Sequence, residues 1–228
     1  MNIELLLTED GSHTLRVEEL DECYHSTHGA VQESMHIFIN AGLRAFAVMD
    51  SVDIRVLEIG FGTGLNAYLT LLESETLNRR IHYTTLELFP ITIDNALQLN
   101  YPEIFCQERS LFEKIHVSEW DKEVEITPCF TLHKIKADFT CYDLQGSYDV
   151  IYFDAFSPEK QPEMWEEKCF RKIFNHSDNG VVLTTYCAKG AVRRAMQSAG
   201  FIVERLSGPV GKREILRGSL PHVNALTL

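Results

Sequence analysis

The sequence lacks the features of a membrane-spanning, a secreted or a metal-binding protein. Hydrophobic residues make up 45% of its 228 residues, but no apolar run approaches the length of a membrane span. The first residues have no basic flank and too short an apolar stretch for a signal peptide. Six cysteines are scattered without a Cys-x-x-Cys pair, and nine histidines show no His-Glu-x-x-His spacing. We therefore expect reduced thiols, no bound metal and a cytoplasmic location.

Internal repeats, low-complexity segments and Pro/Ser-rich linkers are also missing. The length suits one sizeable α/β domain with a short appendage. Residues 1–45 are predicted to form that appendage, a β-hairpin within residues 1–24 followed by a helix. Residues 46–228 are predicted to form the main domain.

Positive charge is scarce, because the formal net charge is −12. That balance argues against non-specific binding to a polyanion. The charge is uneven, however: residues 1–188 hold 14 basic and 31 acidic side chains, and residues 189–228 hold seven basic and two acidic ones. A basic face on an acidic body is compatible with docking one specific nucleic acid, and equally with a solvated surface.

The most informative stretch is residues 54–65, IRVLEIGFGTGL. Its apolar, β-branched start predicts a buried strand, and three glycines (Gly60, Gly62 and Gly64) predict a tight turn into a helix. The dinucleotide-binding fingerprint G-x-G-x-x-G would need a glycine directly after Gly64, and that position is Leu65. Glu58, two residues before the first glycine, suits a cationic ligand better than a pyrophosphate. The pattern E-I-G-x-G-x-G resembles motif I of class I S-adenosylmethionine (SAM) methyltransferases, in which these residues bind the cofactor.

Three further acids follow predicted strands. Glu87 ends the strand of residues 81–88, 23 positions after Gly64, where nucleotide-binding α/β folds place the acid that accepts the two ribose hydroxyls. Asp138 and Phe139 follow a strand within residues 126–135, and class I methyltransferases often contact adenine with such a pair. Asp154 follows the buried strand of residues 150–153, at the sheet edge that faces the ligand crevice. Each acid has a purely structural alternative as a solvated or loop-capping residue.

The end of the chain predicts a strand at residues 181–186, a helix at 189–199 and a closing hairpin of residues 201–206 and 212–218. The whole pattern predicts an α/β fold of the class I SAM-methyltransferase (Rossmann-like) type. Its sheet is expected to be mostly parallel, with a C-terminal antiparallel hairpin and the small N-terminal hairpin and helix.

Three local sequences carry a closer resemblance: D-A-F-S-P-x-K-x-P-x-M-W, T-Y-C-A-K-G-A-V-R-R-A-M-Q-x-A-G-F and G-x-x-G-K-R-E-I-L-R-G. With the lead-in Y-H-S-x-H-G-A-x-Q-E-S-x-H-I-F, they resemble the methyltransferase domain of the tRNA 5-methylaminomethyl-2-thiouridine biosynthesis enzymes (MnmC/MnmD type). The resemblance spans residues 24–218. Bifunctional members also carry an FAD-dependent oxidase domain, for which these residues leave no room, so the chain resembles the stand-alone methyltransferase.

The resemblance implies SAM-dependent N-methylation of the aminomethyl group on the wobble uridine of certain tRNAs. Asp154 would orient the amine or accept its proton. Tyr152 and Phe156 would stack on the uracil ring, although core packing is an equal reading of Tyr152. The expected phosphate contacts near the anticodon loop are the basic residues of the last two motifs. They are Lys189, Arg193, Arg194, Lys212 and Arg213.

Three alternatives remain at this point. The chain could methylate a small amine, for which basic contacts to a polyanion are unnecessary. It could bind SAM without catalysis, as a partner of other tRNA modification enzymes. A NAD-linked oxidoreductase is the weakest alternative, because Leu65 interrupts its fingerprint.

Overall fold

The computed structural model describes residues 2–48 and 53–220. Its first element is a small antiparallel sheet of three strands, β1 (Ile3–Leu7), β2 (His13–Val17) and β3 (Glu22–Cys23). Leu5 pairs with Leu15, so the apolar alternation of the sequence faces one way in both long strands. The predicted N-terminal hairpin is confirmed, and it gains β3 as a third strand.

The main sheet has eight strands in the order β10-β11-β9-β8-β4-β5-β7-β6. Its five parallel strands are β4 (Asp53–Ile59), β5 (Arg80–Leu86), β7 (Phe130–Ile135), β8 (Tyr148–Phe153) and β9 (Ser177–Thr185). The antiparallel strands are β6 (Lys122–Thr127), β10 (Ile202–Ser207) and β11 (Glu214–Ser219). The predicted mostly parallel sheet with a C-terminal antiparallel hairpin is therefore confirmed.

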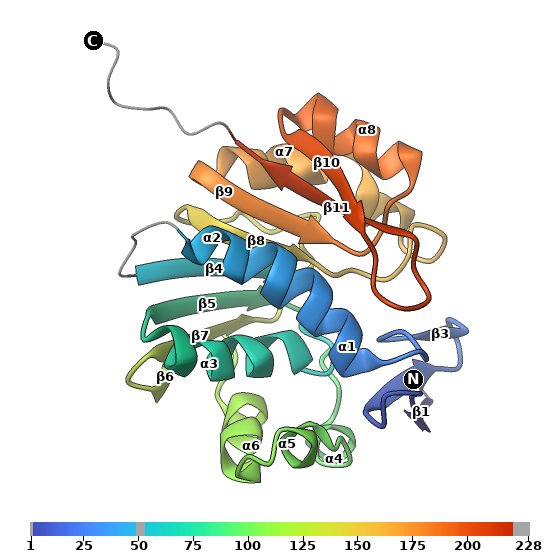
Figure 1. The fold of residues 1–228 in the computed structure, drawn as a ribbon, viewed down its shortest axis with the longest axis vertical. Helices are drawn as coiled ribbons and strands as arrows, with labels where there is room; N and C mark the ends of the chain where they lie inside the picture. The colour runs from blue at the N-terminus through green and yellow to red at the C-terminus, as the bar shows by residue number, and fades with distance from the viewer. Residues whose placement is uncertain (1, 49–52, 221–228) are drawn as a thin grey trace.

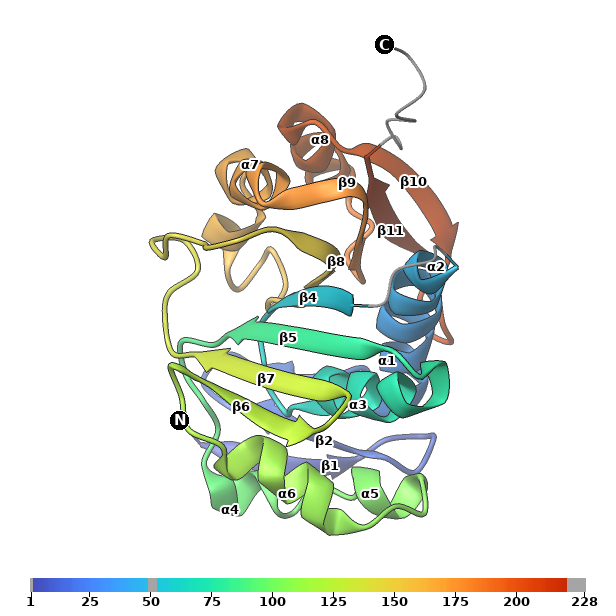
Figure 2. The ribbon, with the colours of Figure 1, turned by 90° about the vertical axis from the view of Figure 1, so that its left-hand side faces the viewer.

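Helices cover both faces of this sheet, as Figures 1 and 2 show. One face packs against a continuous helix built from α1 (Ala30–Ser34), the π-helical η1 (Met35–Leu43) and α2 (Arg44–Ala47), and against α3 (Leu65–Leu77). The other face packs against α7 (Glu167–Asn175) and α8 (Gly190–Ala199). The short helices α4 (Ile93–Ala96), α5 (Tyr101–Ile104) and α6 (Arg109–Val117) connect β5 to β6.

Alternate residues of each central strand enter the two cores, as the pleat requires. Val56 and Tyr152 lie in the core beneath α3 and η1, whereas Leu57 and Phe153 lie in the core beneath α7 and α8. Because η1 packs on β8 and β9, the N-terminal helix shares the core of the main sheet. The domain boundary between residues 45 and 46 stays a prediction.

Two segments add detail to the sequence-based expectation. The strand expected within residues 126–135 is β7, and β6 pairs with it in the antiparallel sense across a turn at Pro128, because proline cannot continue a central ladder. The segment after Asp154 forms a 3₁₀ turn, η2 (Pro162–Trp165), before α7 starts at Glu167. Neither feature moves the carboxyl ends of the parallel strands.

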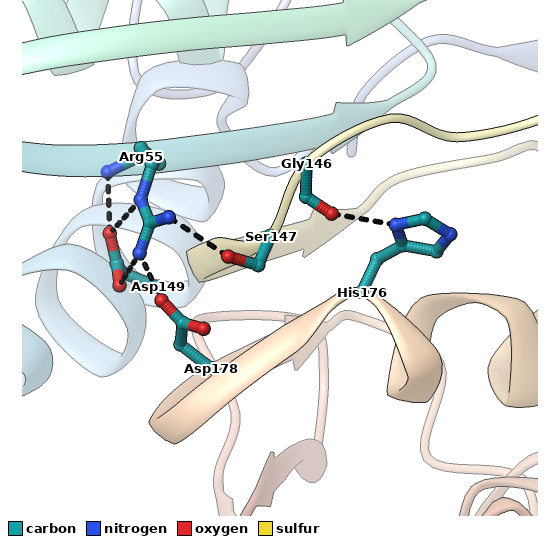
Figure 3. Close-up of polar contacts among 6 residues, drawn as sticks. All are labelled: Arg55, Gly146, Ser147, Asp149, His176 and Asp178. Carbon is teal, nitrogen blue, oxygen red and sulfur yellow. Dashed lines mark hydrogen bonds and ion pairs between the residues drawn. The ribbon is translucent and has the colours of Figure 1, made fainter.

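The amino-terminal ends of β4, β8 and β9 are joined by an arginine (Figure 3). Arg55 donates from Nη2 to Asp149 Oδ1 at 2.9 Å and from Nη1 to Ser147 Oγ at 2.9 Å, and it also pairs with Asp178. Its backbone N–H donates to Asp149 Oδ2 at 2.8 Å, which ties two neighbouring strands together. The pKa of Arg55 is raised by its hydrogen bond to Asp149, so it keeps its charge at any physiological pH. This network fixes strand register at the end of the sheet opposite the cavity described next.

Among the residues that the structure describes, none of the helices has the length and apolar character needed to cross a bilayer.

Candidate active site

A cavity of about 520 Å³ lies at the carboxyl ends of β4, β5 and β8. Its opposite wall comes from the segment of residues 19–26, which contains β3 of the small N-terminal sheet. Figure 1 shows that sheet beside the carboxyl ends of the parallel strands. The volume is that of a pocket for a drug-sized or nucleoside ligand. In an open α/β sheet this is the edge at which ligands bind.

The glycine-rich turn forms the floor of the cavity. Gly60 has φ 96°, and a Cβ on it would lie 2.5 Å from the carbonyl oxygen of Asp154, so the ends of β4 and β8 can approach only because this residue is glycine. Gly64 has φ 71° and precedes α3, where a Cβ would lie 2.8 Å from His116 Nε2. Gly60 and Gly62 line the cavity, whereas Gly64 does not. The turn therefore serves the packing of the chain as well as the approach of a ligand.

Glu87 holds its carboxylate at the cavity wall through two backbone donors. Gly62 N–H donates to its Oε2 at 3.1 Å, and Phe89 N–H donates to its Oε1 at 2.9 Å. Burial raises the pKa of Glu87, while these backbone bonds lower it in part. Each oxygen keeps a second lone pair, so the group can accept two vicinal hydroxyls without moving.

Asp138 and Phe139 line the same end of the cavity. Asp138 Oδ1 accepts from the Thr140 N–H at 2.8 Å and from Thr140 Oγ1 at 2.7 Å, so the loop acid also caps its own turn. Phe139 is 3% exposed, and Lys172 Nζ lies 4.9 Å from its ring centroid. A planar heterocycle at this end would meet an aromatic face beside a carboxylate.

Asp154 lies at the other end of the cavity, directly after β8. Asn66 Nδ2 donates to its Oδ2 at 2.8 Å, and Oδ1 has no hydrogen-bond partner among the described residues. Burial and the negative charge of Glu33 raise the pKa of Asp154 to about 7, against the opposing effects of Asn66 and Lys212. A carboxyl group with this pKa can exchange a proton with a ligand near neutral pH.

The loop after Asp154 is held by three side chains, which accounts for several residues of the D-A-F-S-P…M-W motif. Trp165 Nε1 donates to the Phe156 carbonyl at 2.8 Å, and Tyr186 Oη donates to the Ala155 carbonyl at 2.9 Å. Ser157 donates to Glu22 from both N–H and Oγ, at 3.0 and 2.9 Å. The loop is thus anchored to the N-terminal sheet and to the segment after β9, and Phe156 is fixed at the cavity wall.

Near Asp154, a buried ion pair joins two distant parts of the chain. Lys212 Nζ, on the loop between β10 and β11, lies 2.8 Å from Oε1 of Glu33, on α1. The Glu33 side chain is 9% exposed, and its Oε2 accepts from the Ser26 N–H at 2.8 Å. Lys212 Nζ also lies 4.8 Å from the ring centroid of Tyr186. Lys212 was predicted to contact phosphate, but its charge is matched by Glu33 inside the cavity.

Two predicted contact residues lie in the core instead. Glu58 and Tyr152 are both fully buried, and neither lines the cavity. Both side chains project toward the layer of α3 and η1, because alternate strand residues point to one face of the sheet. Glu58 Oε2 accepts from Thr85 Oγ1 at 2.8 Å, and the Tyr152 ring packs 5.1 Å from that of Phe38. Direct contact of Glu58 with a cofactor cation, or of Tyr152 with a base, is therefore not supported.

The other predicted basic contacts are spread around a shallow groove beside the cavity. Lys189 and Arg213 line this groove together with Lys212, whereas Arg193 and Arg194 lie on α8 outside it. Lys189 pairs with Glu159, while Arg194 and Arg213 have no acidic partner among the described residues. Arg213 is thus the exposed, unmatched positive charge of the groove.

Several cavity residues were not assigned a role from the sequence. Tyr24 faces Phe156 with ring centroids 5.0 Å apart, and His25 Nε2 lies 2.6 Å from Thr63 Oγ1. Burial lowers the pKa of His25 to about 4, so its ring is neutral at pH 7. Tyr24, His25 and Glu33 all belong to the lead-in Y-H-S-x-H-G-A-x-Q-E-S-x-H-I-F, which gave a signal of family resemblance but no role for each residue. Asn66 had no signal of its own.

The two ends of the cavity fit a nucleoside that carries a reactive group. Glu87 offers acceptors for ribose hydroxyls, Phe139 offers an aromatic face, and Gly60 and Gly62 leave the backbone open between them. Among residues 2–48 and 53–220, no group of three or more His, Cys, Asp or Glu side chains could hold a metal ion.

Comparisons with known proteins point to one enzyme family. A family model described as S-adenosyl-L-methionine-dependent methyltransferase matches residues 103–221, just over half of the chain. The tRNA 5-methylaminomethyl-2-thiouridine biosynthesis bifunctional protein MnmC of Actinobacillus pleuropneumoniae serotype 5b is 29% identical over 95% of this chain and 35% of its own length. The MnmC protein of Stutzerimonas stutzeri is 32% identical over 90% of this chain and 33% of its own length. The chain thus spans about a third of these curated relatives.

Solved structures give the same result for the fold. The crystal structure of MnmC2 from Aquifex aeolicus superimposes with a TM-score of 0.76 at 26% identity, covering 98% of this chain and 73% of that one. The spermidine synthase of Thermotoga maritima superimposes with a TM-score of 0.64 at 12% identity, over 96% of this chain and 69% of that one, which is a likeness of fold alone.

Proposed function

The chain belongs to the S-adenosyl-L-methionine-dependent methyltransferase family, and we propose that it methylates the aminomethyl nitrogen on the wobble uridine of tRNA. The product would be 5-methylaminomethyluridine or its 2-thio form. The observation that carries the proposal is the free Oδ1 of Asp154, on a carboxyl group whose pKa is about 7, in the cavity that fits the cofactor. The likeness to MnmC proteins and to MnmC2 supports the choice of substrate.

Glu87, Asp138, Phe139 and the Gly60–Gly62 turn would hold S-adenosylmethionine. When bound, the cofactor supplies a methyl group on a positively charged sulfur. The protein mainly brings the acceptor nitrogen into line with that group and excludes water, which lowers the barrier through positioning. The N-terminal segment of residues 19–26 forms the wall of the cavity opposite the strand ends.

Asp154 acts on the acceptor amine. An alkylamine is mostly protonated near neutral pH, and only its lone pair can form the new C–N bond. A carboxylate with a pKa of about 7 can accept that proton when the amine comes within hydrogen-bond distance. Oδ1 is the atom that is free to accept it, because Asn66 already donates to Oδ2. The neutral nitrogen would then form the C–N bond as the bond from the methyl group to the cofactor sulfur breaks. The product would leave as a protonated secondary amine, and Asp154 would return its own proton to solvent.

Phe156 and Tyr24 are our candidates for holding the uracil ring. Both line the cavity, and the loop bonds described above fix Phe156 in place. A wobble base leaves the anticodon stack more readily than a paired base does, so an aromatic wall can receive it. This assignment replaces Tyr152, which lies in the core.

The shallow groove would receive the tRNA backbone. Arg213 is its exposed cation, and Lys189 lines it in an ion pair with Glu159. Arg193, which is half-buried, and the exposed Arg194 follow on α8. Phosphate contacts of this kind position the RNA without reading its sequence. We also propose that an FAD-dependent oxidase, or the enzymes that install the aminomethyl group, act on the same base before this enzyme does. The proposed location is the cytoplasm, where the tRNA substrate is found.

The test is methyl transfer from labelled S-adenosylmethionine into tRNA from cells that lack this enzyme but install the aminomethyl group. Label should enter that RNA, should not enter RNA without the aminomethyl group, and should fall at least about 100-fold with Asp154→Asn, as loss of a general base predicts. Cofactor binding by Asp154→Asn serves as the control for folding.

Two other functions make different predictions in the same assay. A small-amine methyltransferase would label a free alkylamine and neither RNA, and it would be indifferent to Arg213→Ala. A non-catalytic partner of tRNA modification enzymes would bind the cofactor and label nothing. Membership of the methyltransferase family removes the NAD-linked oxidoreductase from consideration.

A further inference from the structure

Three buried polar atoms without hydrogen-bond partners lie behind Asp154: Oε1 of Glu58, Oδ1 of Asn66 and the hydroxyl of Tyr83. Glu58 is 0% exposed and Asn66 is 2% exposed. Burying such atoms without partners costs about 1–3 kcal/mol each, so their concentration next to a reactive group needs an explanation.

These atoms belong to one chain of side chains that ends at Asp154. Thr85 Oγ1 donates to Glu58 Oε2 at 2.8 Å, and Asn66 Nδ2 donates to Asp154 Oδ2 at 2.8 Å. The side chains of Asn66 and Tyr83 lie beside the Glu58 carboxyl group, and both lower its pKa against the effect of burial. Glu58 comes from β4 and Asn66 from the first turn of α3. This series of side chains therefore connects the two elements that flank the glycine-rich turn.

The Asn66 amide has one donor end and one acceptor end, and its orientation decides what Asp154 meets. With Nδ2 toward Asp154, the amide stabilises the carboxylate. With Oδ1 in that place, two acceptors would repel each other. A group that donates to Oδ1 would select the first orientation.

Glu58 can be that group if it carries a proton. Burial raises the pKa of Glu58 well above its usual range, and the charge of Asp154 raises it further, against the bonds from Thr85, Asn66 and Tyr83. A protonated Oε1 donates to Asn66 Oδ1 and can accept from the Tyr83 hydroxyl. All three unpartnered atoms then have partners.

We propose that Asn66 is a positioning residue for methyl transfer: it holds Oδ2 of Asp154, leaving Oδ1 for the substrate amine, and the Glu58 carboxyl fixes the Asn66 amide as a hydrogen-bond donor. The inference rests on the proposed role of Asp154. Glu58, the acid of the E-I-G-x-G-x-G motif, would then act by holding Asn66 beside Asp154 and not by contacting the cofactor.

Other charged or titratable groups also face Asp154, and the experiment has to separate them. They are Glu33 on α1, Lys212 on the β10–β11 loop, Tyr186 after β9, and Tyr83 on β5. Substitutions at Asn66 and Glu58 leave all four groups in place. A change in the pH profile therefore reports the contacts that Asn66 and Glu58 make with Asp154 and with each other.

The first variant is Asn66→Ala, measured by single-turnover methyl transfer across pH with saturating cofactor. Loss of one hydrogen bond to a carboxylate should lower the rate at pH 7 by at least about tenfold. The acid limb should move to higher pH, because Asp154 loses a donor that favours its charged form. The dissociation constant for S-adenosylmethionine should stay within about threefold, because the lost bond is on the substrate side.

The second comparison is Glu58→Leu against Glu58→Gln. Leucine should reproduce the signature of Asn66→Ala, since nothing then fixes the amide. Glutamine can donate to Asn66 Oδ1 and accept from Thr85, so it should recover most of the activity that leucine loses. The inference is wrong if Asn66→Ala keeps the wild-type pH profile. It is also wrong if Glu58→Gln is as inactive as Glu58→Leu, or if it weakens cofactor binding at least tenfold as loss of a charged cofactor ligand would.

A readout without turnover separates this inference from the proposed function. The pKa of Asp154, followed by carbon-13 NMR of labelled aspartate, should be higher in Asn66→Ala than in the wild type. If the wild type labels no RNA, the proposed function fails, and this titration still decides whether Asn66 holds the carboxylate. An unchanged pKa would overturn the inference in either case.

Discussion

The ion pair between Glu33 and Lys212 makes a sharp prediction about the pH dependence of catalysis. Among the charges around Asp154, Glu33 contributes most to the raised pKa of its carboxyl group, and Lys212 opposes it. Glu33→Gln removes the negative charge and also leaves Lys212 unmatched. Both changes favour the ionised form of Asp154, so its pKa should fall below about 7.

The magnitude follows from the electrostatics of a partly buried cavity. One unit charge at about 6 Å changes a pKa by roughly one unit when the effective dielectric constant is about 40, because one unit equals about 1.4 kcal/mol. At pH 6 the ionised fraction of Asp154 would then rise from about a tenth to about a half. We expect the single-turnover rate at pH 6 to increase about fivefold, with little change at pH 8.

The assay compares wild type and Glu33→Gln on the same aminomethylated tRNA, so that protonation of the substrate amine affects both equally. The amide oxygen that Glu33→Gln introduces can still accept from the Ser26 N–H, which keeps the local backbone in place. Glu123→Gln is the matched control, since it removes one exposed acid from the edge strand β6, far from the cavity. An acid limb that stays in place, or moves to higher pH, would refute the assignment of Asp154 as the titrating group.

Three further variants test other parts of the molecule. Arg213→Ala should raise the KM for tRNA about two- to fivefold and reduce the salt slope of binding by about one, with kcat unchanged; equal salt slopes would remove Arg213 from the RNA surface. Glu87→Gln should weaken S-adenosylmethionine binding about 10- to 100-fold in calorimetry, because a charged acceptor of the ribose hydroxyls is lost. His116 is buried and its pKa is lowered to about 3, so it stabilises the fold fully above its unfolded pKa of about 6.5 and progressively less as the pH falls. Between pH 6.5 and 5, urea unfolding should therefore show wild type losing about 2 kcal/mol more than His116→Gln.

The clustering of the candidate cofactor residues follows from the sequence because it depends on strand ends. Gly60, Glu87 and Asp138 each lie at or just after the end of a predicted strand, and parallel strands bring their carboxyl ends to one edge. No knowledge of long-range contacts is needed for that step. The pleat explains the error at Glu58: it lies inside β4, and its parity with Val56 sends it into the layer under α3.

The substrate half depends on pairs that no local pattern contains. Glu33 and Lys212 are 179 positions apart, and their charges match only because the β10–β11 loop packs against the N-terminal segment. A Cβ on Gly211 of that loop would overlap the ring of His28, so the two segments are in close contact. The motifs predicted RNA contacts for both Lys212 and Arg213, and no local pattern could show that Lys212 pairs with Glu33 while Arg213 stays exposed.

The two halves of the cavity thus differ in origin as well as in chemistry. The α/β repeat builds the end of the cavity that carries Gly60, Gly62 and Glu87. The end around Asp154 is completed by residues 24–33 and by the loop between β10 and β11, both of which lie outside that repeat. Because these two segments supply Tyr24, Glu33 and Lys212, they set both the shape and the charge that an incoming amine meets. Substrate choice should therefore change when they are exchanged between relatives, while cofactor affinity should not.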